Sequence, residues 1–93
     1  MLPEHTKHQL LEWVRNGNTQ PHGSFLTALV SNKLMEAFHA ADDINFECMQ
    51  DIVRWMYEVL PVGCYGSVEK FEHWTGMPEQ LFNNWKRVRG ITD

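Results

Sequence analysis

Two short turns that combine glycine with serine are the features of this sequence best suited to chemistry. Gly23-Ser24 and Gly66-Ser67 each lie just before a predicted helix. The start of a helix presents free backbone N–H groups and a partial positive charge, and a glycine there lets a ligand approach the backbone closely. Each turn therefore predicts either a cradle for a phosphate or carboxylate, or an ordinary N-cap in which the serine hydroxyl caps its helix.

Side chains elsewhere in the sequence would complete a site for an anionic or nucleotide-like ligand. Asn32 supplies an amide donor, and Arg54 would neutralise a phosphate. Tyr57 and Tyr65 would stack on a base. The candidate ligand-binding residues are therefore Gly23, Ser24, Asn32, Arg54, Tyr57, Tyr65, Gly66 and Ser67.

Residues 67–90 are similar to a helix-turn-helix. A short helix, a Thr75-Gly76 turn and a second helix follow one another, and aromatic residues stand where the motif needs apolar ones. Glu72 departs from the pattern, because the motif usually has a small residue there. The residues of the second helix that would read bases or bind phosphates are Gln80, Asn83, Asn84, Lys86 and Arg87. The alternative is a helical hairpin that only closes the core.

The sequence lacks metal-binding and catalytic patterns. His5 and His8 share a helix face, but no third ligand follows at the spacing of a zinc site. A nucleophile elbow, a P-loop and a dinucleotide fingerprint are all missing. Of the two cysteines, Cys48 is expected to be buried and Cys64, in a loop, to be the more accessible. We therefore expect a protein that is not an enzyme and that holds no metal or cofactor.

Charge and hydropathy limit the possible partners. Eight Lys and Arg residues against twelve Asp and Glu residues give a net charge of −4, which disfavours nucleic acid as a partner. No apolar run is long enough to span a bilayer, and the N-terminus lacks the pattern of a secretory signal. The two cysteines form no recognisable disulfide pattern, which fits a reducing compartment. We therefore expect a cytoplasmic protein without a membrane partner.

The periodicity of apolar residues predicts the elements that must position these side chains. The chain of 93 residues forms one domain, 1–93, and apolar residues recur every three to four positions, as in helices. Helices are expected over 4–16, 24–40 and 46–60, and two shorter ones follow Ser67 and Pro78. The predicted fold is all-α, a compact bundle of four to five short helices. Its four tryptophans either fill the core or leave aromatic faces exposed, which would favour a homo-oligomer.

A set of residues spread over the first part of the chain forms a further pattern. It comprises Leu2-Pro3-Glu4-His5-Thr6, Gly23-Ser24-Phe25-Leu26-Thr27-Ala28, Ser31-Asn32, Leu34, Ala37, Ala41-Asp42, Asn45, Ile52-Val53, Tyr57, Pro61, Cys64-x-Gly66-Ser67 and Trp74. Through this pattern, about residues 2–74 resemble a family of small proteins encoded by bacteriophages and prophages. The resemblance implies a phage accessory protein that acts in the cytoplasm of an infected or lysogenic bacterial host.

Three functional hypotheses result. The first is a small, oligomeric binding protein that sequesters a host factor or a ligand. Because both glycine-serine turns belong to the shared pattern, the resemblance makes a nucleotide immune signal the ligand class to consider, and the protein an anti-defence sponge. The alternative is a DNA-binding regulator that uses the helix-turn-helix-like residues 67–90. A virion or morphogenesis component, held by protein contacts alone, is a third possibility.

Overall fold

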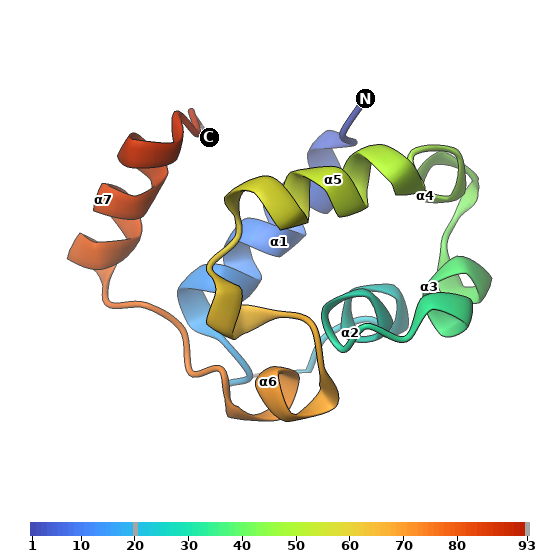
Figure 1. Ribbon diagram of the computed structural model, residues 1–93, viewed down its shortest axis with the longest axis horizontal. Coiled ribbons are helices and arrows are strands. Elements are labelled where there is room, and N and C mark those ends of the chain that lie inside the picture. Colours follow the sequence, from blue (N-terminus) through green and yellow to red (C-terminus); the bar gives the residue numbers. More distant parts are fainter. Residues whose placement is uncertain (20, 93) are drawn as a thin grey trace.

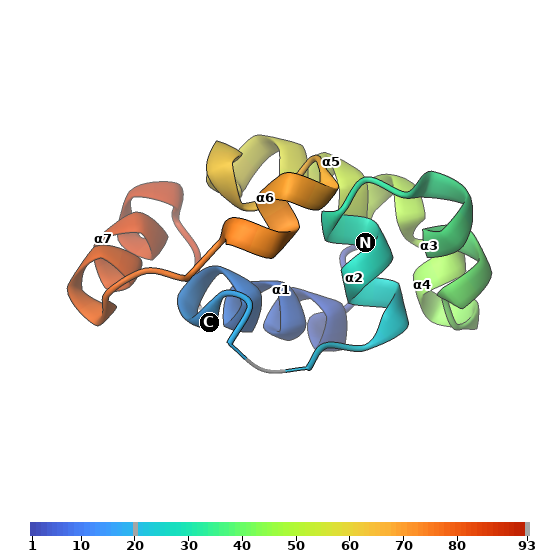
Figure 2. The ribbon, with the colours of Figure 1, turned by 90° about the horizontal axis from the view of Figure 1, so that it is seen from below.

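The computed structural model describes residues 1–19 and 21–92, and these form an all-α fold. It measures 35 × 27 × 19 Å, and α7 and the α3–α4 region occupy the two ends of its longest dimension (Figures 1 and 2). The elements of the described residues are α1 (Glu4–Asn16), α2 (Ser24–Val30), α3 (Leu34–Ala40), α4 (Asp43–Glu47), α5 (Met49–Val59), the 3-10 helix η1 (Val62–Cys64), α6 (Val68–His73) and α7 (Glu79–Arg89). The prediction of an all-α fold is confirmed, with more and shorter helices than the four to five expected. Among these helices, none has the length and apolar character needed to cross a membrane.

The core forms around α1, whose bounds agree with the predicted helix over 4–16. Leu10, Trp13 and Val14 have no exposed surface, because they belong to the buried cluster that also contains Ile52 and Met56 of α5. Trp13 is the largest fully buried side chain, and its ring stacks on that of Phe71 at 5.1 Å. Its indole N–H donates to the carbonyl oxygen of Cys64 at 2.8 Å, so the buried polar atom is satisfied.

The single helix expected over 24–40 is wrong: the chain breaks at Asn32 into α2 and α3. Asn32 has φ 63°, a left-handed conformation that asparagine tolerates better than most residues. The Lys33 N–H donates to the Ala28 carbonyl at 2.9 Å and the Asn32 N–H to the Leu29 carbonyl at 3.3 Å. This pair of bonds is a Schellman motif, which satisfies the last carbonyls of α2 and ends the helix. Apolar residues keep their helical period into α3, so periodicity alone does not reveal that the helix ends at Asn32.

The helix expected over 46–60 begins earlier and is divided at Cys48 into α4 and α5. The Asp42 carboxylate accepts the Asn45 N–H at 2.8 Å, so Asp42 is the N-cap of α4. At the boundary, the Cys48 N–H is shared between two carbonyls, those of Ile44 at 3.1 Å and Asn45 at 3.2 Å. The helix ends before Pro61, as predicted.

The C-terminal part of the chain does not form the hairpin expected over 67–90. Ser67 caps α6 through its hydroxyl, which accepts the Lys70 N–H at 3.1 Å, so that part of the prediction is confirmed. An extended segment, residues 74–78, then carries the chain away from α6 (Figure 1). α7 packs on α1 and α5 instead, with the Trp85 indole N–H donating to the Val59 carbonyl at 3.1 Å. A helix-turn-helix needs two helices packed together across a short turn, and α6 and α7 lack that arrangement.

The four tryptophans pack into the structure rather than forming an exposed face. Trp13 is buried, and Trp55, Trp74 and Trp85 are partly buried against the core. The largest exposed apolar side chains are other residues: Met1, Leu34, Met35, Ile44, Phe46, Val53, Tyr57, Val62, Val68, Leu81 and Val88. Tryptophan therefore does not supply the exposed apolar surface of this protein.

Candidate binding groove

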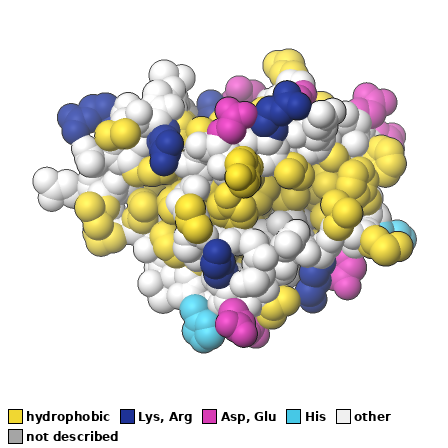
Figure 3. All heavy atoms as spheres, in the orientation of Figure 1, with side chains coloured by type: hydrophobic (Ala, Val, Ile, Leu, Met, Phe, Trp, Pro, Cys, Tyr) yellow, Lys and Arg dark blue, Asp and Glu magenta, His cyan; other side chains and the backbone are white. Residues whose placement is uncertain are grey.

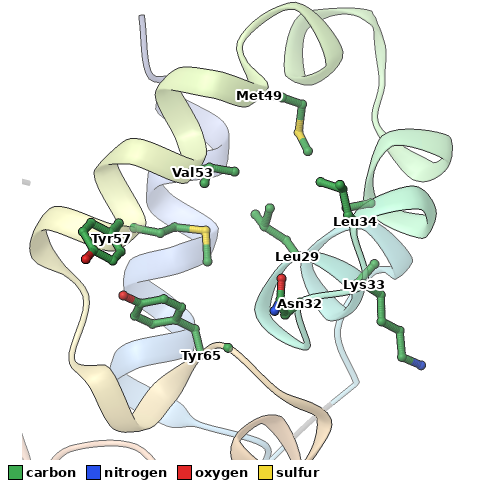
Figure 4. A pocket seen from close by; sticks show the side chains of 12 residues that line it. Leu29, Asn32, Lys33, Leu34, Met49, Val53, Tyr57 and Tyr65 are labelled. Atoms are coloured by element: carbon green, nitrogen blue, oxygen red, sulfur yellow. The ribbon is translucent and has the colours of Figure 1, made fainter.

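An apolar groove runs between α5 on one side and the α2–α3 break on the other (Figure 4). Its cavity volume is about 200 Å³. Its lining residues are Ala28, Leu29, Asn32, Lys33, Leu34, Ala37, Met49, Val53, Met56, Tyr57, Tyr65 and Gly66. Tyr57 and Tyr65 lie at one end, and Met49 and Leu34 lie at the other (Figure 4). In the space-filling view, hydrophobic side chains form a continuous band across this face of the molecule (Figure 3).

Helix periodicity and the break at Asn32 together create the groove. Met49, Val53 and Met56 recur at intervals of three to four along α5, so they lie on one face of that helix. The opposite wall turns at Asn32, so α3 does not continue the axis of α2. Leu34, just after the turn, remains 63% exposed although it lines the groove. The methionines give the groove a flexible and polarisable lining, which adapts to differently shaped apolar groups.

Four of the predicted ligand-binding residues meet in this groove: Asn32, Tyr57, Tyr65 and Gly66. Two of the four also have structural roles. Asn32 ends α2, and the Gly66 N–H donates to the Val30 carbonyl at 2.8 Å. That N–H is therefore already engaged and is not free for a phosphate. Burial raises the pKa of the Tyr65 hydroxyl above its ordinary value, and the neutral phenol can act as a hydrogen-bond donor or acceptor.

The other four predicted residues lie outside the groove. Ser24 lines a separate shallow depression over α2 and α3, together with His22 and His39. Gly23, not Ser24, is the N-cap of α2, and no side chain caps this helix, so the predicted serine cap is wrong here. Ser67 is engaged in capping α6, and Arg54 is not among the groove residues although it belongs to α5. The two glycine-serine turns therefore do not converge on one site.

The electrostatics of the groove are nearly neutral. Lys33 is the one residue with a charged side chain among those described as lining it, and its side chain extends away from the centre of the groove (Figure 4). Its ammonium lies 4.0 Å from a carboxylate oxygen of Glu36, which partly neutralises it. The described lining contains no carboxylate, imidazole or thiol. The groove is therefore suited to recognising an apolar group rather than to proton transfer.

The cysteines are arranged in the opposite way to the expectation. Cys64 is completely buried, and Cys48 is half-buried. Burial raises the pKa of the Cys64 thiol to about 12, which keeps the sulfur protonated and unreactive at neutral pH. The reason is that Cys64 ends η1 beneath Trp13, in a segment that its sequence identified only as a loop. Within the described residues, no group of His, Cys, Asp and Glu side chains could hold a metal ion.

The residues proposed to contact DNA lie on α7, mostly on its exposed face. Gln80, Asn83, Asn84 and Arg87 line one shallow depression together with Leu81, so the structure brings four of the five together. Lys86 points elsewhere, with its ammonium 5.0 Å from the centre of the Phe82 ring. Their arrangement is a property of one helix, since α6 does not pack beside it.

Most of the groove's apolar lining was missed because the sequence marks it as ordinary core. Leu29, Leu34, Met49, Val53 and Met56 belong to regular apolar stripes, which predict burial within a helix. A signal was present in Ser31-Asn32, a pair typical of a helix end, inside the longest expected helix.

Comparison of the chain with protein-family models, curated protein sequences and solved structures finds no match.

Proposed function

We propose that this protein is a non-enzymatic binding protein that captures another protein by receiving one bulky apolar side chain in the groove. The size of the groove carries the proposal. A cavity of about 150 Å³ suffices for benzene, whereas sites for drug-sized ligands span roughly 300–1,000 Å³. At about 200 Å³, the groove matches one aromatic or aliphatic side chain and is small for a whole nucleotide.

The chemistry of the lining supports the same partner class. A nucleotide signal brings phosphates, which need cations or free N–H groups, and Lys33 is the one charged residue described in the lining. An apolar side chain needs only the leucine, valine and methionine surface that the groove offers. Burying one such side chain is worth about 1.5–3 kcal/mol, enough for one anchor residue of a protein interface. Together with the resemblance to phage proteins, this favours a host protein in the bacterial cytoplasm as the partner.

The experiment is affinity capture from bacterial lysate with three forms of the protein. Val53→Trp fills the groove from a position that is 46% exposed, so we expect it to fold normally and to lose the partner. Val62→Trp is the matched control, because Val62 is 74% exposed and outside the groove. The proposal requires a partner retained by the wild type and by Val62→Trp but lost by Val53→Trp. A partner retained equally by all three forms would contradict it.

A nucleotide ligand is the other form of the same hypothesis, and calorimetric titration with ADP-ribose and with a cyclic dinucleotide tests it directly.

The DNA-binding alternative retains one supporting observation, the cluster of Gln80, Asn83, Asn84 and Arg87 on α7. If it is correct, Arg87→Ala weakens binding to duplex DNA and makes the affinity less dependent on salt. Truncation of α7 is not a suitable test, because Phe82 belongs to the buried core.

A further inference from the structure

Charge is divided between the two ends of the molecule. Residues 34–51, which cover α3, α4 and the start of α5, contain Glu36, Asp42, Asp43, Glu47 and Asp51 and no Lys or Arg. The opposite end is basic, with Lys86, Arg87 and Arg89 in the last turns of α7. Arg15 of α1 adds to that end, since its guanidinium lies 5.7 Å from the centre of the Phe82 ring. Figures 1 and 2 both show α7 at one end and α3 and α4 at the other.

Each end also exposes apolar side chains beside its charges. On α7, Leu81 is 57% and Val88 is 72% exposed, and their spacing of seven residues places them on one face of the helix. On α4, Ile44 is 65% and Phe46 is 55% exposed. Exposed apolar residues that are flanked by polar or charged residues can mark a protein interaction site.

Some charges at the acidic end are paired locally, Glu36 with Lys33 and Asp51 with the N-terminal ammonium, but the two ends are too far apart to neutralise each other. The long dimension is 35 Å, and the Debye length is about 8–10 Å at physiological salt, so one end hardly senses the other. Among the described residues, Arg87, Arg89, Asp43 and Glu47 make no ion pair. Asp43 and Glu47 are four apart on the short helix α4, where like charges repel each other. A basic partner at this end would relieve that repulsion.

We propose that α7 of one copy of this protein docks on α4 of a second copy, so that the chain assembles head to tail. The second copy fits because the basic, apolar face of α7 complements the acidic, apolar face of α4. A face-to-face dimer through either end would bring like charges together, which disfavours it. A head-to-tail contact is heterologous and generates either a closed ring or an open chain. The faces involved contain none of the groove residues, so the groove stays available to its own partner.

Sedimentation velocity at two salt concentrations tests the assembly first. At about 20 mM NaCl, where screening is weak, we expect a mass above the 10.9 kDa monomer that rises with protein concentration. At about 500 mM NaCl we expect the monomer to dominate. A monomer at both salts and at all concentrations up to about 1 mM would overturn the proposal. So would an oligomer whose mass does not change with salt.

A charge swap then tests which faces meet. Arg87→Glu and Glu47→Lys each turn an attractive pair into a repulsive one, so each is expected to weaken assembly about tenfold. Mixing the two variants restores assembly, because each then meets a face of opposite charge. Arg54→Glu and Glu72→Lys are the matched controls, since they change the net charge equally at exposed positions away from both ends. Circular dichroism verifies that each variant is folded. Assembly of either swapped variant alone, at wild-type strength, would refute the pairing.

Discussion

Gly76 is a position where the structure predicts a large effect of a single added methyl group. The extended segment that carries it crosses the C-terminal end of α1, where four backbone carbonyls of any helix lack partners. The Met77 N–H donates to the Arg15 carbonyl at 3.1 Å, and the Asn18 N–H donates to the Trp74 carbonyl at 2.8 Å. Gly76 itself has φ 93°, and a Cβ built on it would lie 2.4 Å from the carbonyl oxygen of Arg15.

The cost of Gly76→Ala follows from these values. A left-handed backbone costs a residue with a Cβ roughly 1–2 kcal/mol. The segment must also move away from α1, which weakens the two hydrogen bonds, each worth about 1 kcal/mol. We therefore expect a loss of about 3–4 kcal/mol in the free energy of unfolding. A domain of this size has roughly 5–14 kcal/mol in total, and the melting temperature should fall by about 12–30 °C.

Urea unfolding followed by tryptophan fluorescence measures the effect, with two glycine variants as references. Gly90→Ala isolates the backbone term, because Gly90 has φ 70° with open space around it, and should cost about 1 kcal/mol. Gly63→Ala should be nearly neutral, since its Cβ would make an ordinary contact of 3.7 Å with Trp74 and its φ is not positive. If Gly76→Ala costs no more than Gly90→Ala, the close crossing of the segment over α1 is refuted.

Three further predictions concern single side chains. Ellman's reagent should modify Cys48 in the folded protein and Cys64 only after unfolding, and modification of both at equal rates would contradict the burial of Cys64. The pKa of Cys64 is raised to about 12 in the folded state, so above pH 9 the thiol loses its proton in the unfolded chain but keeps it in the folded protein. Between pH 9 and 12, the free energy of unfolding of the wild type should therefore fall by about 1.4 kcal/mol per pH unit relative to that of Cys64→Ala. Ser67→Ala should cost about 1 kcal/mol by removing a cap, whereas Ser24→Ala should cost little, and equal urea midpoints for the two would contradict this difference.

The elements that the sequence predicted well are those with local signals. The helix over 4–16 has a clear apolar stripe with Gly17 just after it, and the helix after Pro78 ends at Gly90 in the left-handed region. Asp42 and Ser67 are caps because short polar side chains before a helix accept its free N–H groups. Each of these features depends on a few neighbouring residues, so periodicity and capping rules suffice.

The features that the sequence did not predict depend on residues distant in the chain. The break at Asn32 interrupts a row of apolar residues without changing its helical period. Tertiary packing therefore decides which of these apolar side chains are buried and which line the groove. The burial of Cys64 depends on Trp13, which is far away in sequence. The separation of α6 from α7 results from the crossing at Gly76, whereas a Thr-Gly turn alone is equally compatible with a hairpin. The groove exists only because these non-local contacts fix the positions of its walls.

The central claim is that the groove takes one bulky apolar side chain, and an NMR titration with N-acetyltryptophanamide tests it most directly. Amide resonances of ¹⁵N-labelled protein report which residues sense the probe. Burying one apolar side chain is worth about 1.5–3 kcal/mol, so weak affinity, with a dissociation constant in the millimolar range, is expected. We predict shifts centred on Leu29, Val53 and Tyr65 that disappear in Val53→Trp and persist in Val62→Trp. Shifts centred elsewhere, or none at about 10 mM probe, would contradict the proposed function.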